Sequence, residues 1–253
     1  MDINGITSFR DLILAPLGAN EILVIACDSL GGVGPKPHDN VKTPADVVGK
    51  FTVRVPLMEV LACGASPFAV VNTLNVEMEP TGTGFIKGIR EEIMMAGLSD
   101  DIAITGSTEE NTTTCQSGLG ITVIGRAAKS ELRLGKSGAG DLVVCMGWPK
   151  VGSEVLDGTE NADPVLVKKL LTLPYVREIL PVGSCGVLYE AELLALGSGN
   201  RLALMPFPNI DLQKHKSAGP STCILVSIEE IYLTALSELT DLPLFIIGSL
   251  AKK

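Results

Sequence analysis

The sequence predicts a mixed α+β protein with two domains, and three observations support this prediction. The chain has 253 residues, enough for one large domain or two modest ones. Hydrophobic residues make up 46% and charged residues 19%, a globular composition far from that of a disordered chain. Segments with strand and helix patterns alternate through both halves, and a glycine-rich stretch at 134–141 separates them.

Strand and helix signals in the first half begin with the apolar run Glu21–Cys27, which predicts a strand ending at Asp28, before a glycine-rich turn. Thr43 and Pro44 are typical of a helix start, and apolar residues keep helical spacing up to Gly64. Pro56 lies inside this segment and predicts a kink, or two helices end to end. The remaining predicted elements of this half are strands over 67–76, 102–105 and 118–127, a helix over 83–96 and a polar loop over 106–114.

The second half carries a similar mixture of elements and no solenoid repeat. The predicted strands are 142–146, 201–205, 222–226 and 244–247, and the predicted helices are 164–171, 185–196 and 228–239. The six cysteines never form a C-x-x-C pair and lie among apolar or small neighbours. We therefore expect buried, reduced thiols.

The charge balance excludes some classes of partner. Twenty Lys and Arg residues stand against 29 Asp and Glu residues, a net charge of −9, and no basic stripe interrupts this balance. We therefore expect no nucleic-acid partner and no membrane partner. No apolar run reaches the ~18 residues of a membrane span, and no signal-peptide pattern is present, so the cytoplasm is the expected location.

Several familiar motifs fail on inspection. Gly135-Lys136-Ser137 looks like the end of a phosphate-binding P-loop, but Ser130 stands where that motif needs its first glycine. The turn after Asp28 does not match the dinucleotide-binding glycine pattern either. The only histidines, His38 and His215, are far apart in the sequence, which argues against zinc proteases and most Ser-His-Asp hydrolases.

What remains is a set of carboxylates at predicted strand ends and loops, whose oxygen atoms suit a hard cation such as Mg²⁺. These residues are Asp11, Asp28, Glu59, Glu109 and Glu110. Taken singly, each is more typical of a solvated surface acid. Asp28 is the exception, because a charged residue between an apolar strand and a glycine turn lies where backbone N–H groups and a metal can meet a phosphate.

Three segments together resemble the aminoimidazole ribonucleotide (AIR) synthetase superfamily, which includes thiamine-monophosphate kinase, selenophosphate synthetase and a hydrogenase maturation factor. They are Asp28 with Gly32-Val33-Gly34-Pro35-Lys36, then Leu61–Pro67, then Thr105–Glu110. The first is similar to the synthetase's D-G-V-G-T-K, with a short insertion after Asp28. The resemblance covers nearly the whole chain. It implies a half-barrel N-terminal domain (1–134) that binds ATP and Mg²⁺ and dimerises, and a smaller, shortened α/β C-terminal domain (135–253).

The resemblance also suggests roles for individual residues. Glu59 falls where the family has a metal-binding Asp in S-D-x-x-A-M-G-A-x-P, and Asp11 falls at the second Asp of the G-D-D of thiamine-monophosphate kinase. The family's G-G-D-T loop appears as Thr105-Gly106-Ser107-Thr108, without its acid, so Glu109 or Glu110 would stand in.

The resulting prediction assigns each candidate residue a role. The metal ligands are Asp11, Asp28 and Glu59; the catalytic candidates are Asp28, Lys36, Glu109 and Glu110; the nucleotide-binding candidates are Gly31, Gly32, Gly34, Lys36, Gly106, Ser107, Thr108 and Asn111.

Within the superfamily, the short length and the loop Gly106-Ser107-Thr108-Glu109-Glu110-Asn111 look closest to the α-ribazole kinases of cobalamin salvage. This resemblance implies ATP and Mg²⁺ as cofactors, a homodimer, and transfer of the γ-phosphate to a nucleoside-like acceptor, giving α-ribazole 5′-phosphate. The enzymatic alternatives are a thiamine-monophosphate kinase or another ATP-dependent synthetase of the superfamily. The non-enzymatic alternative is a nucleotide-sensing dimer.

Overall fold

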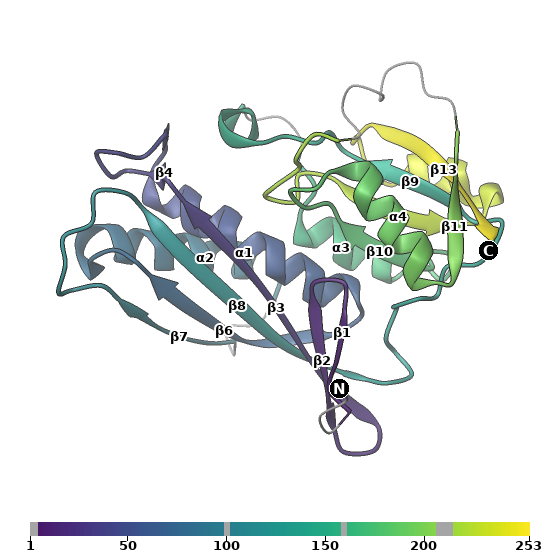
Figure 1. The fold of residues 1–253 in the computed structure, drawn as a ribbon, viewed down its shortest axis with the longest axis horizontal. Helices are drawn as coiled ribbons and strands as arrows, with labels where there is room; N and C mark the ends of the chain where they lie inside the picture. The colour runs from purple at the N-terminus through teal and green to yellow at the C-terminus, as the bar shows by residue number, and fades with distance from the viewer. Residues whose placement is uncertain (1–4, 99–101, 158–160, 206–214) are drawn as a thin grey trace. The chain divides into compact units, whose positions relative to one another are not determined.

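The structure, a computed structural model, describes residues 5–98, 102–157, 161–205 and 215–253. The chain divides into two compact units (Figure 1). The N-terminal unit comprises Met1–Leu61 and Ala65–Ser130, and the C-terminal unit comprises Ala62–Gly64 and Glu131–Lys253. Both units contain a sheet and helices, so the predicted α+β class is confirmed.

A six-stranded sheet forms the N-terminal unit, in the order β1-β2-β3-β8-β6-β7. The strands are β1 (Thr7–Phe9), β2 (Leu12–Leu17), β3 (Glu21–Gly31), β6 (Ser66–Leu74), β7 (Ala103–Thr108) and β8 (Gly118–Ala128). Only β6 and β7 are parallel neighbours in this sheet. The short strands β4 (Val33–Gly34) and β5 (Val41–Lys42) pair separately.

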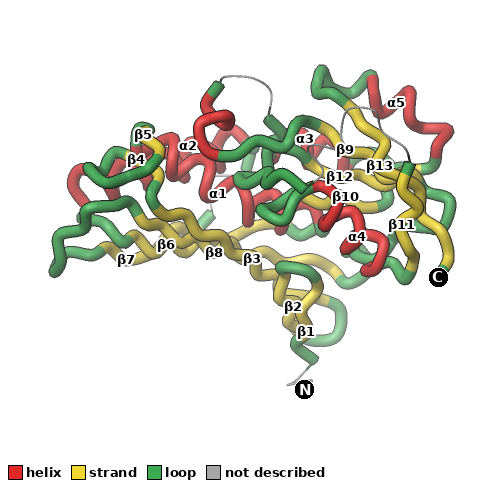
Figure 2. The backbone as a smooth tube through the Cα atoms, turned by 45° about the horizontal axis from the view of Figure 1, so that its top comes forward, coloured by secondary structure: helices red, strands yellow, loops and turns green. Residues whose placement is uncertain are grey.

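Two helices, α1 (Ala45–Ala62) and α2 (Thr83–Met95), lie on one face of this sheet (Figures 1 and 2), and the π-helical segment η1 (Met78–Gly82) precedes α2. Alternate residues of β3 reflect this covering. Ile22, Val24 and Ala26 of β3 are buried on the helix side. Cys27, the next residue along the strand, is exposed on the opposite side. On the second face of the sheet, which we call the open face, no helix of the N-terminal unit lies among the residues that the structure describes.

Glycines let α1 and α2 approach closely. A Cβ at Gly49 would lie 2.0 Å from the carbonyl oxygen of Phe85, and one at Gly88 would lie 1.8 Å from that of Asp46. Near the other end of this contact, buried Arg54 of α1 donates to buried Glu92 of α2, with Nε and Oε1 2.6 Å apart. The close approach at the two glycines and the buried ion pair together hold α1 and α2 in one position relative to each other.

The C-terminal unit contains a five-stranded antiparallel sheet in the order β10-β12-β9-β13-β11. Its strands are β9 (Leu142–Met146), β10 (Glu178–Pro181), β11 (Asn200–Leu204), β12 (Ile224–Ile228) and β13 (Leu244–Lys252). Its helices are α3 (Pro164–Leu171), α4 (Val187–Gly197) and α5 (Leu233–Ser237), with 3₁₀ turns at η2 (Gly152–Leu156) and η3 (Glu230–Tyr232). Buried residues of α4, including Ala191 and Leu194, pack in one core with Val143 and Leu225 of the sheet.

Several predicted boundaries are wrong. The strand predicted to end before Asp28 continues to Gly31, because β3 stays paired with β8 up to Gly31 opposite Gly118. The helix predicted over 228–239 is only a 3₁₀ turn and the short α5, because Ile228 belongs to β12, opposite Leu142. Helix α1 runs continuously through Pro56, so two separate helices do not form.

The expected burial of all six cysteines is also wrong: Cys27, Cys115 and Cys185 are exposed, and the other three are buried. In the part of the chain that the structure describes, no helix has both the length and the apolar character needed to cross a membrane.

Changing Glu92 to Gln is expected to lower the free energy of unfolding by about 3 kcal/mol, because the buried Arg54 guanidinium loses its charged partner. The double variant Arg54→Met/Glu92→Met is expected to recover most of this loss, since an apolar pair needs no charge compensation. Urea denaturation measures both. Lys87→Gln is the control, because its ion pair is exposed, and it should leave stability nearly unchanged. A Glu92→Gln protein as stable as the parent would contradict the prediction.

Candidate functional site

Three chain segments meet at one end of the N-terminal sheet: residues 31–42 after β3, 75–78 after β6, and 109–117 between β7 and β8. Backbone hydrogen bonds tie them together. The N–H of Gly32 donates to Ser117 O over 2.9 Å, and the N–H of Glu109 donates to Val76 O over 3.0 Å. Because β6 and β7 are parallel, their final residues reach the same sheet edge, and the loops that follow lie side by side there.

Asp39 fixes the glycine-rich segment, and nothing in the sequence distinguished it from other loop acids. Its carboxylate is buried and accepts hydrogen bonds from the N–H of Lys36 (2.8 Å), the N–H of Ser117 (2.7 Å) and Ser117 Oγ (2.8 Å). Gly34 lies against this cluster with a φ of +147°, and a Cβ there would lie 2.4 Å from Ser117 Oγ. Glycine is therefore required at Gly34 for the loop to close on Asp39.

Lys36, a predicted phosphate-binding and catalytic residue, is held by a second acid that the sequence analysis missed. Its Nζ donates to Glu77 Oε2, and Thr81 Oγ1 donates to Glu77 Oε1 over 2.5 Å. Burial alone would raise the pKa of Glu77, but hydrogen bonds from Lys36 and Thr81 outweigh it and hold the pKa below its usual value. Glu77 is thus a carboxylate at ordinary pH, and it orients the Lys36 ammonium.

The two acids of the last loop also lie in this region. Glu110 Oε1 accepts a hydrogen bond from the N–H of Met78 (2.8 Å), which ties its loop to the segment that carries Glu77. Glu109 Oε1 accepts from the N–H of Asn111 (2.8 Å) and of Thr112 (3.0 Å), which fixes the loop's own turn. The structure therefore brings Glu109, Glu110 and Asn111 into the same loop cluster as Lys36.

Residues 106–108 were expected in a loop, but they form the end of β7, opposite Asn72–Leu74 of β6. A Cβ at Gly106 would lie 2.1 Å from Asn72 O, so this glycine permits the close approach of the two strands. Gly106 and Ser107 thus have a structural role in the sheet, and Thr108 is the residue of this group nearest the loop cluster.

Asp28 lies three residues before the end of β3, on the helix side of the sheet, about 10 Å along the strand from Gly31. Burial raises the pKa of its carboxyl group, partly opposed by a backbone hydrogen bond from Ser29. Asp11 occupies the turn before β2, and the pairing of Ile13 with Ile25 brings Asp11 toward the Cys27 end of β3.

Glu59 lies on helix α1. Its neighbour Val60 packs against β8, because a Cβ at Gly125 would lie 2.5 Å from Val60 Cγ1. Gly125 is four positions along β8 from Ile121, which is the partner of Asp28. Four strand residues correspond to about 13 Å. In the described chain no three His, Cys, Asp or Glu residues group as metal ligands, so Asp11, Asp28 and Glu59 do not form one cluster.

The chemistry of Asp28 nevertheless fits a divalent cation. Magnesium is commonly bound by one or two carboxylates together with waters and substrate phosphates. The pKa of Asp28 is raised by burial, and no cationic side chain contributes to that shift. A bound cation would supply the compensating charge.

Residues 11–127 match the family described as AIR synthase related protein, N-terminal domain. This match supports the resemblance to the AIR synthase-related superfamily that the sequence motifs predict, over the N-terminal part of the chain. No curated protein matches the chain.

Three solved structures illustrate the fold to which this chain is similar. Thiamine-monophosphate kinase from Stenotrophomonas maltophilia K279a is 21% identical with a TM-score of 0.64, over 98% of this chain and 89% of that one. AaThiL, solved with AMPPCP and TMP, is 17% identical with a TM-score of 0.59, over 96% and 85%. The hydrogenase maturation protein HypE, solved with ATP, is 16% identical with a TM-score of 0.62, over 94% and 79%.

Changing Asp28 to Asn is expected to stabilise the metal-free protein at neutral pH, because the folded state no longer buries this charge. The raised pKa means that the parent bears this cost in full only above the pKa of Asp28 in the folded protein. The gain should therefore shrink as the pH falls through that pKa and vanish below the ordinary pKa of 3.8. Urea denaturation across this pH range measures it, and a gain that grows toward acid pH would contradict the assignment.

Proposed function

We propose that the protein is an ATP-dependent kinase that transfers the γ-phosphate of ATP to the hydroxyl group of a small acceptor. The observation that carries the proposal is the loop cluster at one end of the N-terminal sheet, where Lys36 is oriented by Glu77 beside the Glu109–Asn111 loop. Relatives of similar fold were solved with AMPPCP and with ATP, which supports nucleotide binding by this scaffold.

Phosphoryl transfer depends mainly on alignment of the acceptor with the γ-phosphate and on charge neutralisation. In the proposed mechanism, Lys36 contacts the ATP phosphates, and Glu77 keeps its ammonium group in place before nucleotide binds. The 31–34 glycine segment allows close backbone approach to the phosphates, since Asp39 and Ser117 hold it in one conformation. Glu109 and Glu110 fix the facing loop, and Thr108 and Asn111 lie at its ends.

Asp28 would hold a magnesium ion, which when bound supplies positive charge to the transferring phosphoryl group. Burial favours this role, because a carboxylate held in low-dielectric surroundings gains more from a cation than a solvated one does. The ATP- and magnesium-binding role is therefore proposed for the N-terminal unit, and the acceptor-binding role for the C-terminal unit.

We propose α-ribazole as the acceptor, a neutral nucleoside. Support comes from the basic side chains of the C-terminal unit, which would be needed to bind a phosphorylated acceptor such as thiamine monophosphate. Arg177 pairs with Glu229, Lys216 Nζ lies 2.7 Å from Glu154 Oε2, and Arg201 Nε donates to Lys252 O over 3.2 Å. Lys214, another basic candidate, lies outside the described residues. Lys150, a further basic candidate, is half-buried. Because three of the described basic candidates already have partners, we favour an uncharged acceptor.

Parallel assays with Mg-ATP are expected to give a higher kcat/KM for α-ribazole than for thiamine monophosphate, because a neutral nucleoside needs no additional cations. The products should be ADP and α-ribazole 5′-phosphate. A higher kcat/KM for thiamine monophosphate would overturn the acceptor assignment. Formation of ADP, free phosphate and a cyclised product would indicate a ligase, and ATP binding without any turnover would indicate a nucleotide sensor.

Two neighbouring variants on β3 test the metal site in the same assay, one as the test and the other as its control. Asp28→Asn should reduce kcat/KM by about a thousandfold or more, since a neutral amide cannot replace a carboxylate on the metal. Ser29→Ala changes an exposed residue on the opposite face and should retain the parent activity. Unchanged kcat/KM in Asp28→Asn would refute the metal site without excluding the kinase activity.

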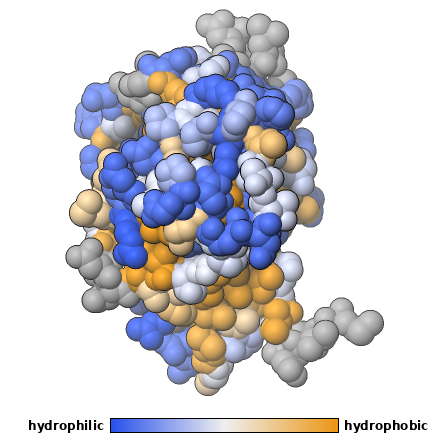
Figure 3. All heavy atoms as spheres, turned by 90° about the vertical axis from the view of Figure 1, so that its left-hand side faces the viewer, coloured by the Kyte–Doolittle hydropathy of each residue, from blue (hydrophilic) through white to orange (hydrophobic). Residues whose placement is uncertain are grey.

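We also propose that the open face of the N-terminal sheet forms a homodimer interface. Neighbouring strands place Ile13, Ile25 and Ile124 in one row across this face, next to Ala69 of β6. Ile13 is 44% exposed, and apolar side chains gather in the lower part of the view in Figure 3. Pairing of two such faces would remove this apolar surface from water.

Light scattering at micromolar concentration is expected to give twice the chain mass of 26.5 kDa. Ile13→Glu should shift the mass toward that of a monomer, because it introduces a charge into the proposed interface. Ile231→Glu, at an exposed apolar residue of the C-terminal unit, is the matched control and should leave the mass unchanged. A monomeric parent protein would refute the interface.

A further inference from the structure

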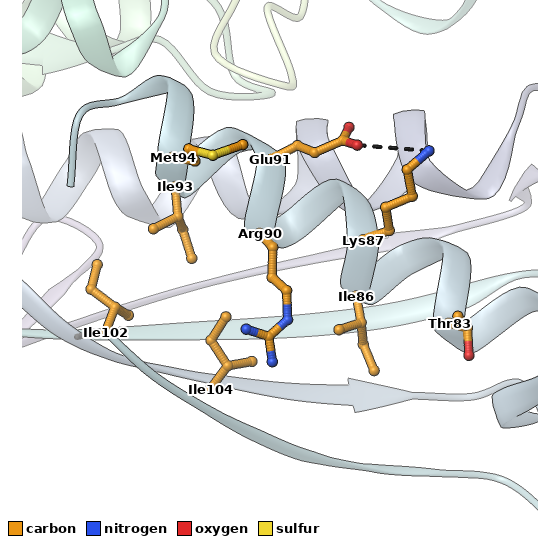
Figure 4. A pocket seen from close by; sticks show the side chains of 9 residues that line it. All are labelled: Thr83, Ile86, Lys87, Arg90, Glu91, Ile93, Met94, Ile102 and Ile104. Carbon is orange, nitrogen blue, oxygen red and sulfur yellow. Dashed lines mark ion pairs between the residues drawn. The ribbon is translucent and has the colours of Figure 1, made fainter. Parts of the chain in front are cut away.

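A groove of about 480 Å³ runs along α2 in the N-terminal unit, from Thr83 to Met94 (Figure 4). Its walls are mainly apolar. Ile86, Ile93 and Met94 of α2 form one side, and Ile102 and Ile104, at the start of β7, form the other. This volume lies within the range of about 300–1,000 Å³ that is typical of small-ligand sites.

Three charged residues of α2 also line the groove, and two of them compensate each other. Lys87 Nζ lies 3.7 Å from Glu91 Oε1 and 3.3 Å from Asp46 Oδ2. The guanidinium of Arg90, in contrast, points between Ile86 and Ile104 (Figure 4), and no ion pair to it is present among the residues that the structure describes. Among the described residues, the groove therefore presents one positive charge that has no acidic partner, in a chain whose net charge is −9.

We propose that this groove is a second binding site, for a small molecule with an apolar body and one carboxylate or phosphate group. The Arg90 guanidinium would bind the anionic group through paired N–H donors, for which its planar geometry is suited. The apolar body would lie on the isoleucine side chains and lose its contact with water. An apolar cation would be repelled by Arg90, and a strongly polar anion would gain nothing from the apolar walls.

The site is separate from the proposed nucleotide site. Ile102 and Ile104 lie at the start of β7, whereas the loop cluster lies beyond Thr108, where β7 ends. The groove would therefore serve as an additional ligand site whether or not the protein is a kinase.

The test is an NMR titration of the full chain labelled at isoleucine δ1 methyl groups, with phenylpropionate and its neutral analogue phenylpropionamide as probes. Phenylpropionate is expected to give saturable shifts at the methyl groups of Ile86, Ile93, Ile102 and Ile104. Its affinity should exceed that of the amide by about tenfold, because only the carboxylate pairs with Arg90.

Two variants of neighbouring groove residues separate the charge effect from general disruption. Arg90→Gln should weaken phenylpropionate binding about tenfold and leave the amide's affinity unchanged. Lys87→Gln is the matched control: it removes a charge that is already compensated and should change either affinity by less than about twofold.

Several results would overturn the proposal. They are equal affinities for the two probes, equal losses in the two variants, shifts that rise linearly without saturation, and shifts confined to Ile13, Ile25 and Ile124 of the open face. Unchanged isoleucine methyl signals outside the groove verify that each variant remains folded.

Discussion

The close contact between α1 and α2 is the constraint on which the N-terminal unit depends. Gly49 and Gly88 permit backbone contact that any side chain would prevent, and the buried Arg54–Glu92 pair fixes the two helices in one register. Since α1 follows the glycine-rich loop and α2 follows the Glu77 segment, this register sets where both segments end. The position of Lys36 relative to Glu77 is thus inherited from helix packing remote from the loops.

Long, strongly patterned elements could be predicted from the sequence. The strand at 118–127, the helix at 83–96 and the strand at 142–146 coincide with β8, α2 and β9 within one residue. Elements stabilised by tertiary pairing could not be predicted in this way. Strand β10 has only four residues. The end of β3 carries Asp28, Ser29 and Gly31, which have low strand preference. Pairing with β8 along its whole length overrides that local preference.

The same contrast between local sequence signals and tertiary contacts explains which residues of the candidate site could be predicted. Lys36, Glu109 and Glu110 could be predicted because they flank glycine or polar loops, and the structure brings them together. Glu77 and Asp39 could not, because their roles arise from contacts with residues distant in the sequence, 41 and 78 positions away. Glu59 was placed with the metal ligands by motif alignment alone, and among the described residues it does not group with Asp11 and Asp28 as a set of metal ligands.

The pairing of β3 with β8 has a consequence for how the chain folds. These strands make the longest ladder in the N-terminal unit, yet one lies near the start of the chain and the other follows α1, β6, α2 and β7. Closure of so long a loop costs entropy before the ladder contributes stability, so folding of this unit is expected to be slow for its size. During synthesis, the central pair of the sheet cannot form until Ala128 has left the ribosome. Until then, β3 exposes an unpaired apolar edge, which makes this nascent segment a natural client for a chaperone.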